Sequence, residues 1–400
     1  MFFYSLLLSL ALPFICLRLL WKSRHNPDYR RRWAERFAMR LPPPLADCLL
    51  VHCVSVGEFL TLKPLLAHWL EREPVNFWLC CTTPTGSAQI RKFVAEWPER
   101  LRHSYLPYDQ PWLVKRFLRH VRPRAVILME TELWPNLIVQ AHGENLPVIL
   151  ENARLSARSC RRYRRYLGWL LPQIIGPLKI NGQNRATGRR FRHLGAQTVR
   201  LSPSLKFYSP PPPPPPLAAG DKPIWLWAST HPGEEEQLLE IYKRLSGWQL
   251  VIAPRHPERR TEIRTLLERH GFRVRQRSKG ETLGDVYLLD TLGELAGFYG
   301  LAQVAFIGGS LVKRGGHNPL EALHQGTPVC FGPSMFNFQE ISEEICRQPF
   351  AKQVQRPEEL LALLPELARW KNAPALTDYR HRHADLLERH LRILQEFINA

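Results

Sequence analysis

The sequence lacks several signatures that would assign a chemistry at once. Its eight cysteines form no Cys-x-x-Cys pair and show no metal-ligand spacing, and Cys80 and Cys81 are adjacent within a predicted strand. We therefore expect buried thiols in a reducing compartment, with neither disulfides nor a structural zinc. No Walker A motif and no Gly-x-Gly-x-x-Gly is present, so neither a P-loop ATPase nor a dinucleotide enzyme is supported.

Acidic residues are also in short supply. Lys and Arg number 55 against 36 Asp and Glu, which gives a formal net charge of +19. This imbalance favours anionic partners, namely nucleic acid, anionic lipid or phosphorylated substrates. An apolar content of 44% excludes wholesale disorder, and 400 residues suffice for two domains with separate cores.

One long apolar run stands at the amino terminus. Residues 2–21 are apolar apart from Ser5, Ser9 and Arg18, which is close to the roughly 20 residues that a spanning helix needs. No small-residue cleavage site follows, and the positive-inside tendency places the clustered basic residues after it in the cytoplasm. We predict a single-pass membrane anchor over residues 1–21, with a buried core helix as the alternative. The basic residues are Lys22, Arg24, Arg30, Arg31, Arg32 and Arg36.

Short apolar runs alternate with helical periodicity along the rest of the chain. This rhythm predicts an α/β architecture of two Rossmann-like, doubly wound domains that face each other across a cleft. The predicted strands are CLLVHCV, VNFWLCC, RAVILM and LPVILE in the first half and PIWLWA, QLVIAP, DVYLLD, QVAFIGG and TPVCFG in the second. We expect a first domain over 22–207, a Pro-rich linker over 208–221 with seven consecutive prolines, a second domain over 222–373, and one amphipathic helix within 374–400 that packs across the domain boundary.

Carboxylates follow two predicted strands of the first domain, where parallel sheets bind ligands. Glu58 comes after CLLVHC, and Pro64 predicts that the regular helix begins near residue 63. Glu130 and Glu132 come after RAVILM, in METELWPN. One of them could simply pair with a cation or cap a helix. Three carboxylates on neighbouring loops nevertheless indicate a general base.

The second half carries basic and amide side chains at the equivalent places. Arg255 and His256 follow the strand QLVIAP, and arginine suits a phosphate or carboxylate. After two glycine pairs, Asn318, Pro319 and Glu321 form a start resembling a capping box. That motif has one interpretation as a helix cap. It has another as a nucleotide site, with a phosphate on the helix N-terminus and Glu321 at the ribose.

Nine motifs occur in one order, namely VSVGE, TTPTGS, YLPYDQP, METELWPNLI, ENARLSARS, STHPGEEE, PRHPER, FIGGSL and RGGHNPLEA. In this set the chain resembles, over essentially its whole length, the 3-deoxy-D-manno-octulosonic acid (Kdo) transferases of lipid A biosynthesis, glycosyltransferase family 30. The resemblance implies a GT-B enzyme of the inner membrane, with its catalytic domains on the cytoplasmic side. It also implies inverting, metal-independent transfer of Kdo from CMP-Kdo to lipid IVA, a tetraacyl lipid A precursor, with no cofactor.

The resemblance also assigns roles to particular residues. It makes Glu58 the general base, and Glu130 and Lys206 stabilisers of the transition state. Pro203 and Tyr208 stand beside Ser-Leu-Lys-Phe where the family usually has Gly and Asp. The CMP site maps onto three segments, which are Pro254, Arg255 and His256; Leu292, Gly293 and Glu294; and Asn318, Pro319, Leu320 and Glu321.

One further surface is a segment in which arginines and aromatic residues alternate, and two rival functions stay open. Arginines interleaved with aromatics suit an anionic membrane surface, with a solvated helix face as the alternative. One rival function is a GT-B enzyme that uses a UDP-sugar for another envelope glycolipid. The other is a basic nucleic-acid-binding protein without catalysis, but no recognition motif is present, and we expect no nucleic-acid partner. The interleaved residues are Arg154, Arg158, Arg161, Arg162, Tyr163, Arg164, Arg165, Tyr166 and Trp169.

Overall fold

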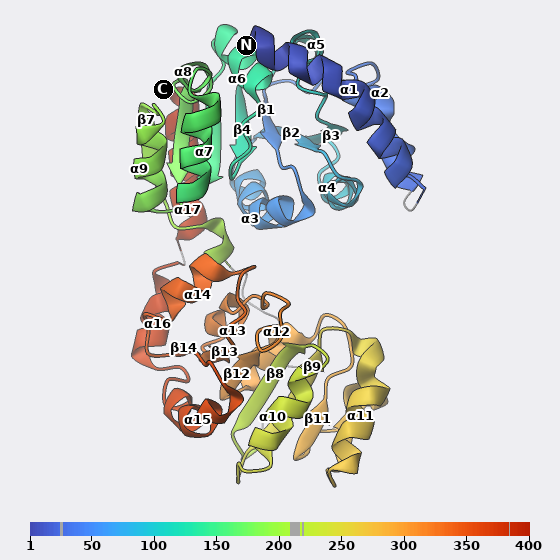
Figure 1. The fold of residues 1–400 in the computed structure, drawn as a ribbon, viewed down its shortest axis with the longest axis vertical. Helices are drawn as coiled ribbons and strands as arrows, with labels where there is room; N and C mark the ends of the chain where they lie inside the picture. The colour runs from blue at the N-terminus through green and yellow to red at the C-terminus, as the bar shows by residue number, and fades with distance from the viewer. Residues whose placement is uncertain (25–26, 209–216, 218–219, 384) are drawn as a thin grey trace. The chain divides into compact units, whose positions relative to one another are not determined.

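The computed structural model describes residues 1–24, 27–208, 217, 220–383 and 385–400. These residues form two compact units (Figure 1). Unit 1 comprises Met1–Tyr208 and Asp385–Ala400, and unit 2 comprises Ser209–Ala384. Most of the predicted linker, including all seven prolines, lies outside the described residues.

Unit 1 is built on a parallel sheet of seven strands in the order β3-β2-β1-β4-β5-β6-β7. The order of the strands along the chain reverses between β1 and β4, as it does in doubly wound folds. The strands are β1 (Cys48–His52), β2 (Asn76–Cys81), β3 (Leu101–Tyr105), β4 (Ala125–Met129), β5 (Val148–Ala153), β6 (Leu178–Gly182) and β7 (Thr198–Leu201).

Helices cover both faces of this sheet. Because successive side chains of a strand point to opposite faces, Leu50 belongs to one core cluster and Leu49 and Val51 to the other. Burial on both faces explains why β4 is apolar throughout and why β1 and β5 begin with apolar runs. The helices are α2 (Trp33–Arg36), α3 (Val56–Arg72), α4 (Pro84–Glu96), α5 (Pro111–Val121), α6 (Pro135–Gly143), α7 (Ala157–Leu167), α8 (Leu171–Ile174), α9 (Arg185–His193) and α17 (Leu386–Asn399), with the 3-10 turns η1 (Pro27–Arg30) and η2 (Leu205–Phe207).

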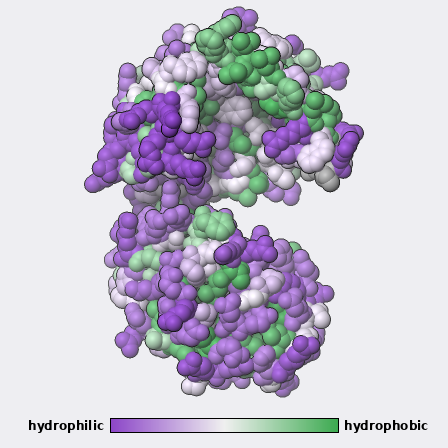
Figure 2. All heavy atoms as spheres, in the orientation of Figure 1, coloured by the Kyte–Doolittle hydropathy of each residue, from purple (hydrophilic) through white to green (hydrophobic). Residues whose placement is uncertain are grey.

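The N-terminal helix α1 (Phe2–Lys22) is long and apolar enough to cross a membrane. Its polar side chains nevertheless contact unit 1, where Tyr4 Oη donates to Asp109 Oδ2 at 3.0 Å and Ser5 Oγ donates to Asn136 Oδ1 at 3.1 Å. The opposite face is exposed and hydrophobic, as the green surface at the top of Figure 2 shows. Exposed residues on that face include Phe2, Phe3, Leu6, Leu7, Leu10, Phe14 and Leu17.

Unit 2 repeats the architecture, with a parallel sheet in the order β10-β11-β9-β8-β12-β13-β14. The strands are β8 (Ile224–Thr230), β9 (Gln249–Pro254), β10 (Val274–Gln276), β11 (Val286–Leu288), β12 (Val304–Ile307), β13 (Val329–Phe331) and β14 (Ala351–Gln353). The helices are α10 (Glu234–Tyr242), α11 (Arg260–Arg269), α12 (Leu295–Leu301), α13 (Leu320–His324), α14 (Gln339–Ile345), α15 (Leu360–Ala368) and α16 (Pro374–His381), with the 3-10 turns η3 (Pro257–Arg259), η4 (Arg277–Lys279) and η5 (Pro357–Glu359).

The carboxyl-terminal stretch differs from the single amphipathic helix expected within 374–400. The described residues of this stretch form two helices, of which α16 belongs to unit 2 and α17 to unit 1. Helix α17 packs Leu387, Leu391, Leu394 and Phe397 into the core cluster that also holds α3. The chain therefore ends in the unit in which it begins.

Candidate functional site

The reversal of strand order between β1 and β4 marks the place where a sheet of this kind binds ligands. Glu58 lies there, in the first turn of α3, and its carboxylate accepts hydrogen bonds from Val54 N at 2.8 Å and from Ser55 Oγ at 3.2 Å. Ser55 caps the helix in return by accepting from Glu58 N. Glu58 is thus held in one orientation at the carboxyl end of β1.

The prediction that this helix begins near residue 63 is wrong. Helix α3 begins at Val56 and includes Pro64 in its interior. The proline lacks an N–H and removes one backbone hydrogen bond, which is normally costly. A buried face compensates by packing the helix on the sheet through Phe59, Leu62, Leu65, Leu66, Trp69 and Leu70.

Glu130 and Lys206, which are far apart along the chain, form an ion pair of 3.0 Å between Oε1 and Nζ. Glu130 follows β4 and has a left-handed backbone with φ of 54°, a conformation uncommon for residues other than glycine. Glu151 O accepts a hydrogen bond from Glu130 N at 3.0 Å. Strained backbone of this kind collects at functional sites, where the surrounding structure holds it.

The loop that carries Lys206 is supported by residues that no sequence motif identified. Asn152 Oδ1 accepts a hydrogen bond from Leu205 N at 3.0 Å. His390 of α17 pairs with the buried Glu151 and lies 2.8 Å from Pro203 O through Nε2. The C-terminal helix therefore helps to hold Lys206 beside Glu130. The contacts join residues that are far apart in the sequence, so no local sequence pattern predicts them.

At this edge of the sheet, burial and neighbouring carboxylates raise the pKa of Glu58 and of Glu132. Burial raises the pKa of Glu58, and the charge of Glu130 raises it further, whereas the hydrogen bonds from Val54 and Ser55 and the charge of Lys206 oppose the rise. Burial also raises the pKa of Glu132 to about 7, with the charge of Glu58 as the next cause. Near neutral pH this cluster can accept a proton, which is the property a general base needs.

In unit 2 the strand order reverses between β8 and β12, and the predicted donor-site residues follow β9, β11 and β12. Pro254 is buried at the end of β9, whereas Arg255 and His256 are exposed beyond it. His256 lies 3.5 Å from Glu258 through Nδ1 and Oε1. The arginine side chain is thus presented at the carboxyl edge of the sheet.

The predicted capping box at the Asn318 motif is wrong in register, because Pro319 and not Asn318 directly precedes the helix and the Pro319 side chain makes no capping hydrogen bond. Asn318 Oδ1 accepts a hydrogen bond from Leu320 N at 3.1 Å, although α13 is only five residues long and begins after Pro319. Burial raises the pKa of Glu321, whereas the Asn318 side chain and the positive charge of Arg255 lower it. The structure therefore brings Glu321 and Arg255 into one electrostatic neighbourhood.

The third predicted donor segment follows β11. In the sheet, β9 lies between β11 and β8. Leu292 is exposed, and Gly293 has φ of 85°, which favours glycine. Glu294 is held by Arg277, with 2.6 Å between Oε1 and Nη2. Hydrogen bonds from Arg277 and Thr291 lower the pKa of Glu294, so this carboxylate is charged at neutral pH.

Glu234 is a buried residue that the sequence analysis missed. Its carboxylate accepts backbone hydrogen bonds from His231, Gly309, Ser310 and Leu311, at 2.6 to 2.9 Å. These four bonds join the loop after β8 to the loop after β12. The sequence shows only a run of three glutamates at a helix start. Acidic residues are common in the first turn of a helix, where they interact favourably with the helix dipole, so the run did not single out Glu234.

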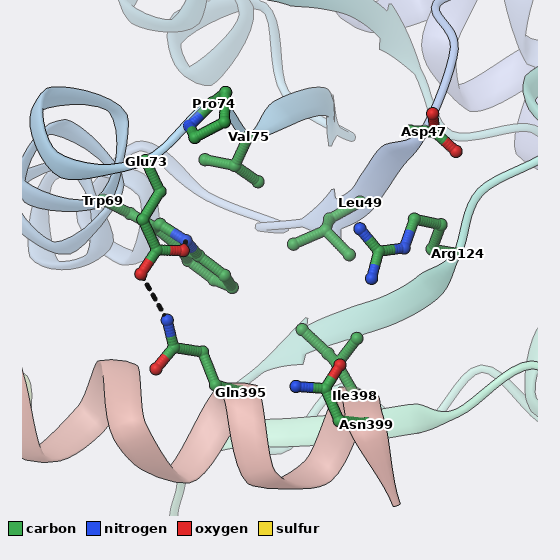
Figure 3. A pocket seen from close by; sticks show the side chains of 10 residues that line it. All are labelled: Asp47, Leu49, Trp69, Glu73, Pro74, Val75, Arg124, Gln395, Ile398 and Asn399. Atoms are coloured by element: carbon green, nitrogen blue, oxygen red, sulfur yellow. Dashed lines mark hydrogen bonds between the residues drawn. The ribbon is translucent and has the colours of Figure 1, made fainter.

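The open cavity drawn in Figure 3 lies elsewhere in unit 1. It has a volume of about 440 Å³ and lies between the end of α3, the end of α17 and the start of β1. Leu49 and Arg124 lie at the amino ends of β1 and β4, so this cavity occupies the edge of the sheet opposite the carboxylates. It is separate from the candidate site.

Comparison with known proteins decides the family. The family profile described as 3-Deoxy-D-manno-octulosonic-acid transferase (kdotransferase) matches residues 31–209. A 3-deoxy-D-manno-octulosonic acid transferase of Haemophilus influenzae is 37% identical over 362 residues, 85% of this chain and 84% of the relative. The chain belongs to the Kdo transferase family. A second relative of the same name, from Bordetella pertussis, is 35% identical and covers 77% of this chain and 76% of its own length.

This Kdo transferase is therefore a glycosyltransferase, and its fold agrees with that class. MurG of Acinetobacter baumannii superposes with a TM-score of 0.58 at 11% identity, over 87% of this chain and 99% of that one. The glycotransferase of kitacinnamycin gives a TM-score of 0.55 at 15% identity, over 89% and 98%. These likenesses confirm the predicted GT-B architecture of two Rossmann-like sheets.

Proposed function

We propose that this Kdo transferase moves Kdo from CMP-Kdo to lipid IVA, with inversion at the anomeric carbon. The acceptor hydroxyl attacks that carbon while its proton passes to a base, and the bond to CMP breaks with both electrons leaving on the phosphate. The observation that carries this proposal is the cluster of Glu58, Glu130 and Lys206 at the carboxyl edge of unit 1. The family resemblance assigns these same three residues to catalysis.

In this proposal Glu58 takes the proton of the acceptor hydroxyl. Its two hydrogen bonds orient the carboxylate, and its raised pKa brings it nearer to the working pH than that of an exposed glutamate. Glu130 and Lys206 hold a fixed pair of charges beside it. Such preorganised charges stabilise the transition state because they need no rearrangement when the reaction occurs.

CMP binds to unit 2 in this proposal, through Arg255 and the start of α13. A guanidinium and backbone N–H groups suit a single phosphate, and they can stabilise its charge as CMP leaves without a divalent metal. Glu321 reaches the ribose hydroxyls, and the segment Leu292–Glu294 completes the site. Support comes from the shared edge of the sheet and from the electrostatic coupling of Glu321 with Arg255.

Helix α1 attaches the enzyme to the inner membrane in this proposal, with both units on the cytoplasmic side. Its exposed apolar face suits acyl chains, while its bonds to Asp109 and Asn136 keep the helix against unit 1. We therefore propose that the helix lies within the membrane interface, in place of the single-pass span that its sequence predicts. The exposed arginines of α7, together with the exposed Tyr166 and Trp169, provide a second contact for anionic headgroups.

The reaction is tested with the purified full-length enzyme, CMP-Kdo and lipid IVA in detergent. Product mass should increase by whole Kdo units, and CMP should raise the melting temperature while UDP and DNA should not. Stabilisation by UDP alone would favour the rival UDP-sugar enzyme. Stabilisation by DNA without any product would favour the non-catalytic rival.

The attachment is tested by removing residues 1–21. The shortened chain should lose stable membrane association and retain only salt-sensitive binding through α7, as measured by flotation with vesicles of anionic lipid. A full-length chain that stays soluble at low salt would contradict the anchor. Labelling of residue 1 by a reagent confined to the periplasm would contradict the interfacial placement.

A further inference from the structure

Two histidines meet where the strand order of unit 2 reverses. His231 follows β8 and His317 follows β12, and their Nε2 atoms are 3.0 Å apart. The planes of the two rings are parallel to within 1°, with centroids 5.2 Å apart. This is the position in the sheet at which doubly wound folds bind their ligands.

The two loops are built to keep this pair together. Glu234 accepts backbone hydrogen bonds from both loops, including those from His231 at 2.9 Å and Gly309 at 2.6 Å. Gly309 has φ of 70°, and a Cβ atom there would lie within 3.4 Å of both imidazole rings. The contact therefore depends on a buried carboxylate and on a glycine at one particular position.

The surroundings of the pair are positively charged. His256 approaches His231 edge-on with centroids 5.9 Å apart, and Arg255, Arg259 and Arg314 act on His231 electrostatically. Burial, followed by these charges, lowers the pKa of His231, and burial together with His231 lowers the pKa of His317 to about 4. The pair is thus neutral at pH 7, and the positive charges around it favour the binding of an anion.

The nearby carboxylates are engaged with other groups. Glu234 is saturated by four backbone N–H groups, Glu235 is paired with Arg259 at 2.7 Å, and Glu258 lies 3.5 Å from His256. Glu321 acts on Arg255 and is hydrogen-bonded by Asn318. An incoming anion therefore meets the histidine pair and Arg255 with little competition from the chain itself.

Hydrogen bonding sets how many protons the pair can hold. A bond between two Nε2 atoms needs one N–H and one lone pair, so the neutral pair already shares one proton. One further proton can enter at the Nδ1 of the donor ring and leave the bond intact. A second would protonate both Nε2 atoms and place two cations in contact, which breaks the bond. The pair can therefore carry a single positive charge.

We propose that His231 and His317 form an anion subsite that takes up one proton when the phosphate of the donor nucleotide binds. The proposal rests on the proposed function, because it assumes a CMP-sugar in unit 2. The gained charge strengthens the hold on the phosphodiester and on the phosphate that leaves as the glycosidic bond forms. The histidine pair differs from the donor residues proposed above, because it becomes positively charged when the ligand binds and neutral again when the ligand leaves.

The test uses the full-length enzyme in detergent and the methyl ester of CMP, a phosphodiester without a titratable proton near neutral pH. Calorimetry at pH 6.5 in buffers of different ionisation enthalpy counts the protons exchanged on binding. We expect uptake approaching one proton, and an affinity that rises by up to about tenfold for each unit that pH falls. Cytidine, which lacks the phosphate, should bind without proton uptake, and so should free Kdo if its carboxylate does not use this subsite.

Variants locate the proton. His317→Asn and His231→Asn should each bind the ester with little uptake and a flat pH dependence. His270→Asn, at an exposed histidine of the same unit, should behave as the parent enzyme does. If either site variant fails to fold, NMR of 15N-labelled histidines in the parent enzyme replaces it, and one new imidazolium should appear on binding.

The outcomes separate the two proposals. Binding of the ester without proton uptake, or uptake that persists in both site variants, overturns the histidine subsite and leaves the transferase assignment intact. Proton uptake on binding of free Kdo, with none on binding of the ester, would show that the histidines bind the Kdo carboxylate and not the phosphate. That result would overturn the proposal. No binding of the ester, in an enzyme that still transfers sugar from a UDP donor, overturns both.

Discussion

The two units use the same place in the same kind of sheet for opposite electrostatic purposes. In unit 1 the reversal of strand order presents carboxylates, Glu58 after β1 and Glu130 after β4. In unit 2 it presents cationic and imidazole groups, His231 after β8 and His317 after β12, with Arg255 close by. A cluster of negative charge in a partly buried site holds carboxylates ready to accept a proton, whereas a cluster of positive charge holds imidazoles ready to bind an anion. In the proposed reaction, one architecture thus provides both the base and the site of the leaving nucleotide.

The strongest test of this division is Glu58→Gln. Loss of the base should lower kcat by about 10²- to 10⁴-fold, because general-base catalysis contributes that much, while the affinity for CMP stays unchanged. Glu71→Gln, at an exposed position of the same helix, is the matched control. A near-normal kcat at neutral pH in Glu58→Gln would show that unit 1 does not supply the base.

The next test asks whether the unit 1 charges act as one group. Glu130→Gln should lower kcat substantially, because Lys206 loses its partner at 3.0 Å and the left-handed turn loses its charged anchor. The double variant Glu58→Gln, Glu130→Gln should be little worse than Glu58→Gln alone, since residues that act as a unit are not additive. Additive losses in single-turnover rates would separate the two roles.

A third test addresses unit 2 by changing Glu321 to Ala. Loss of a hydrogen bond between a charged group and the ribose costs about 1.5–3 kcal/mol, or roughly ten- to hundredfold in the donor KM. A residue that only stabilises the helix start would instead lower the melting temperature, by the equivalent of about 1 kcal/mol. Glu340→Ala, in the first turn of α14, is the control. An unchanged donor KM with a lowered melting temperature would exclude the nucleotide role.

The smallest expected effect is a shift in the acid limb of the pH profile of kcat/KM. Glu58 must be deprotonated to act, so activity falls as pH falls through its raised pKa. Glu130→Gln removes a charge that raises this pKa, so the limb should move to lower pH. Lys206→Met removes a charge that lowers it, so the limb should move to higher pH. Shifts in the same direction, or none, would contradict the electrostatic coupling.

The strands were predictable where the sheets are most deeply covered. All nine predicted strands are present, and all of them occupy inner positions of the two sheets, although β2, β11 and β13 each lie next to an edge strand. Five strands were not predicted, namely β3, β6, β7, β10 and β14, and four of these lie at sheet edges. Edge strands carry polar residues such as Arg102, Arg200 and Arg275, because one side of an edge faces solvent. A short, mixed pattern of this kind does not differ from that of a loop.

Local chemistry in the sequence also determined which residue types stand at the carboxyl ends of the strands, because strand, turn and helix start are encoded within a few neighbouring residues. It identified Glu58, Glu130, Arg255 and the Asn318 motif in this way. Four features depend instead on strand order and packing. They are the ion pair of Lys206 with Glu130, the packing of α17 in unit 1, the hydrogen bonds that Glu234 accepts from two loops, and the histidine pair. Contacts between residues so distant along the chain form only when the sheet brings its loops to one edge, and therefore only the tertiary structure decided them.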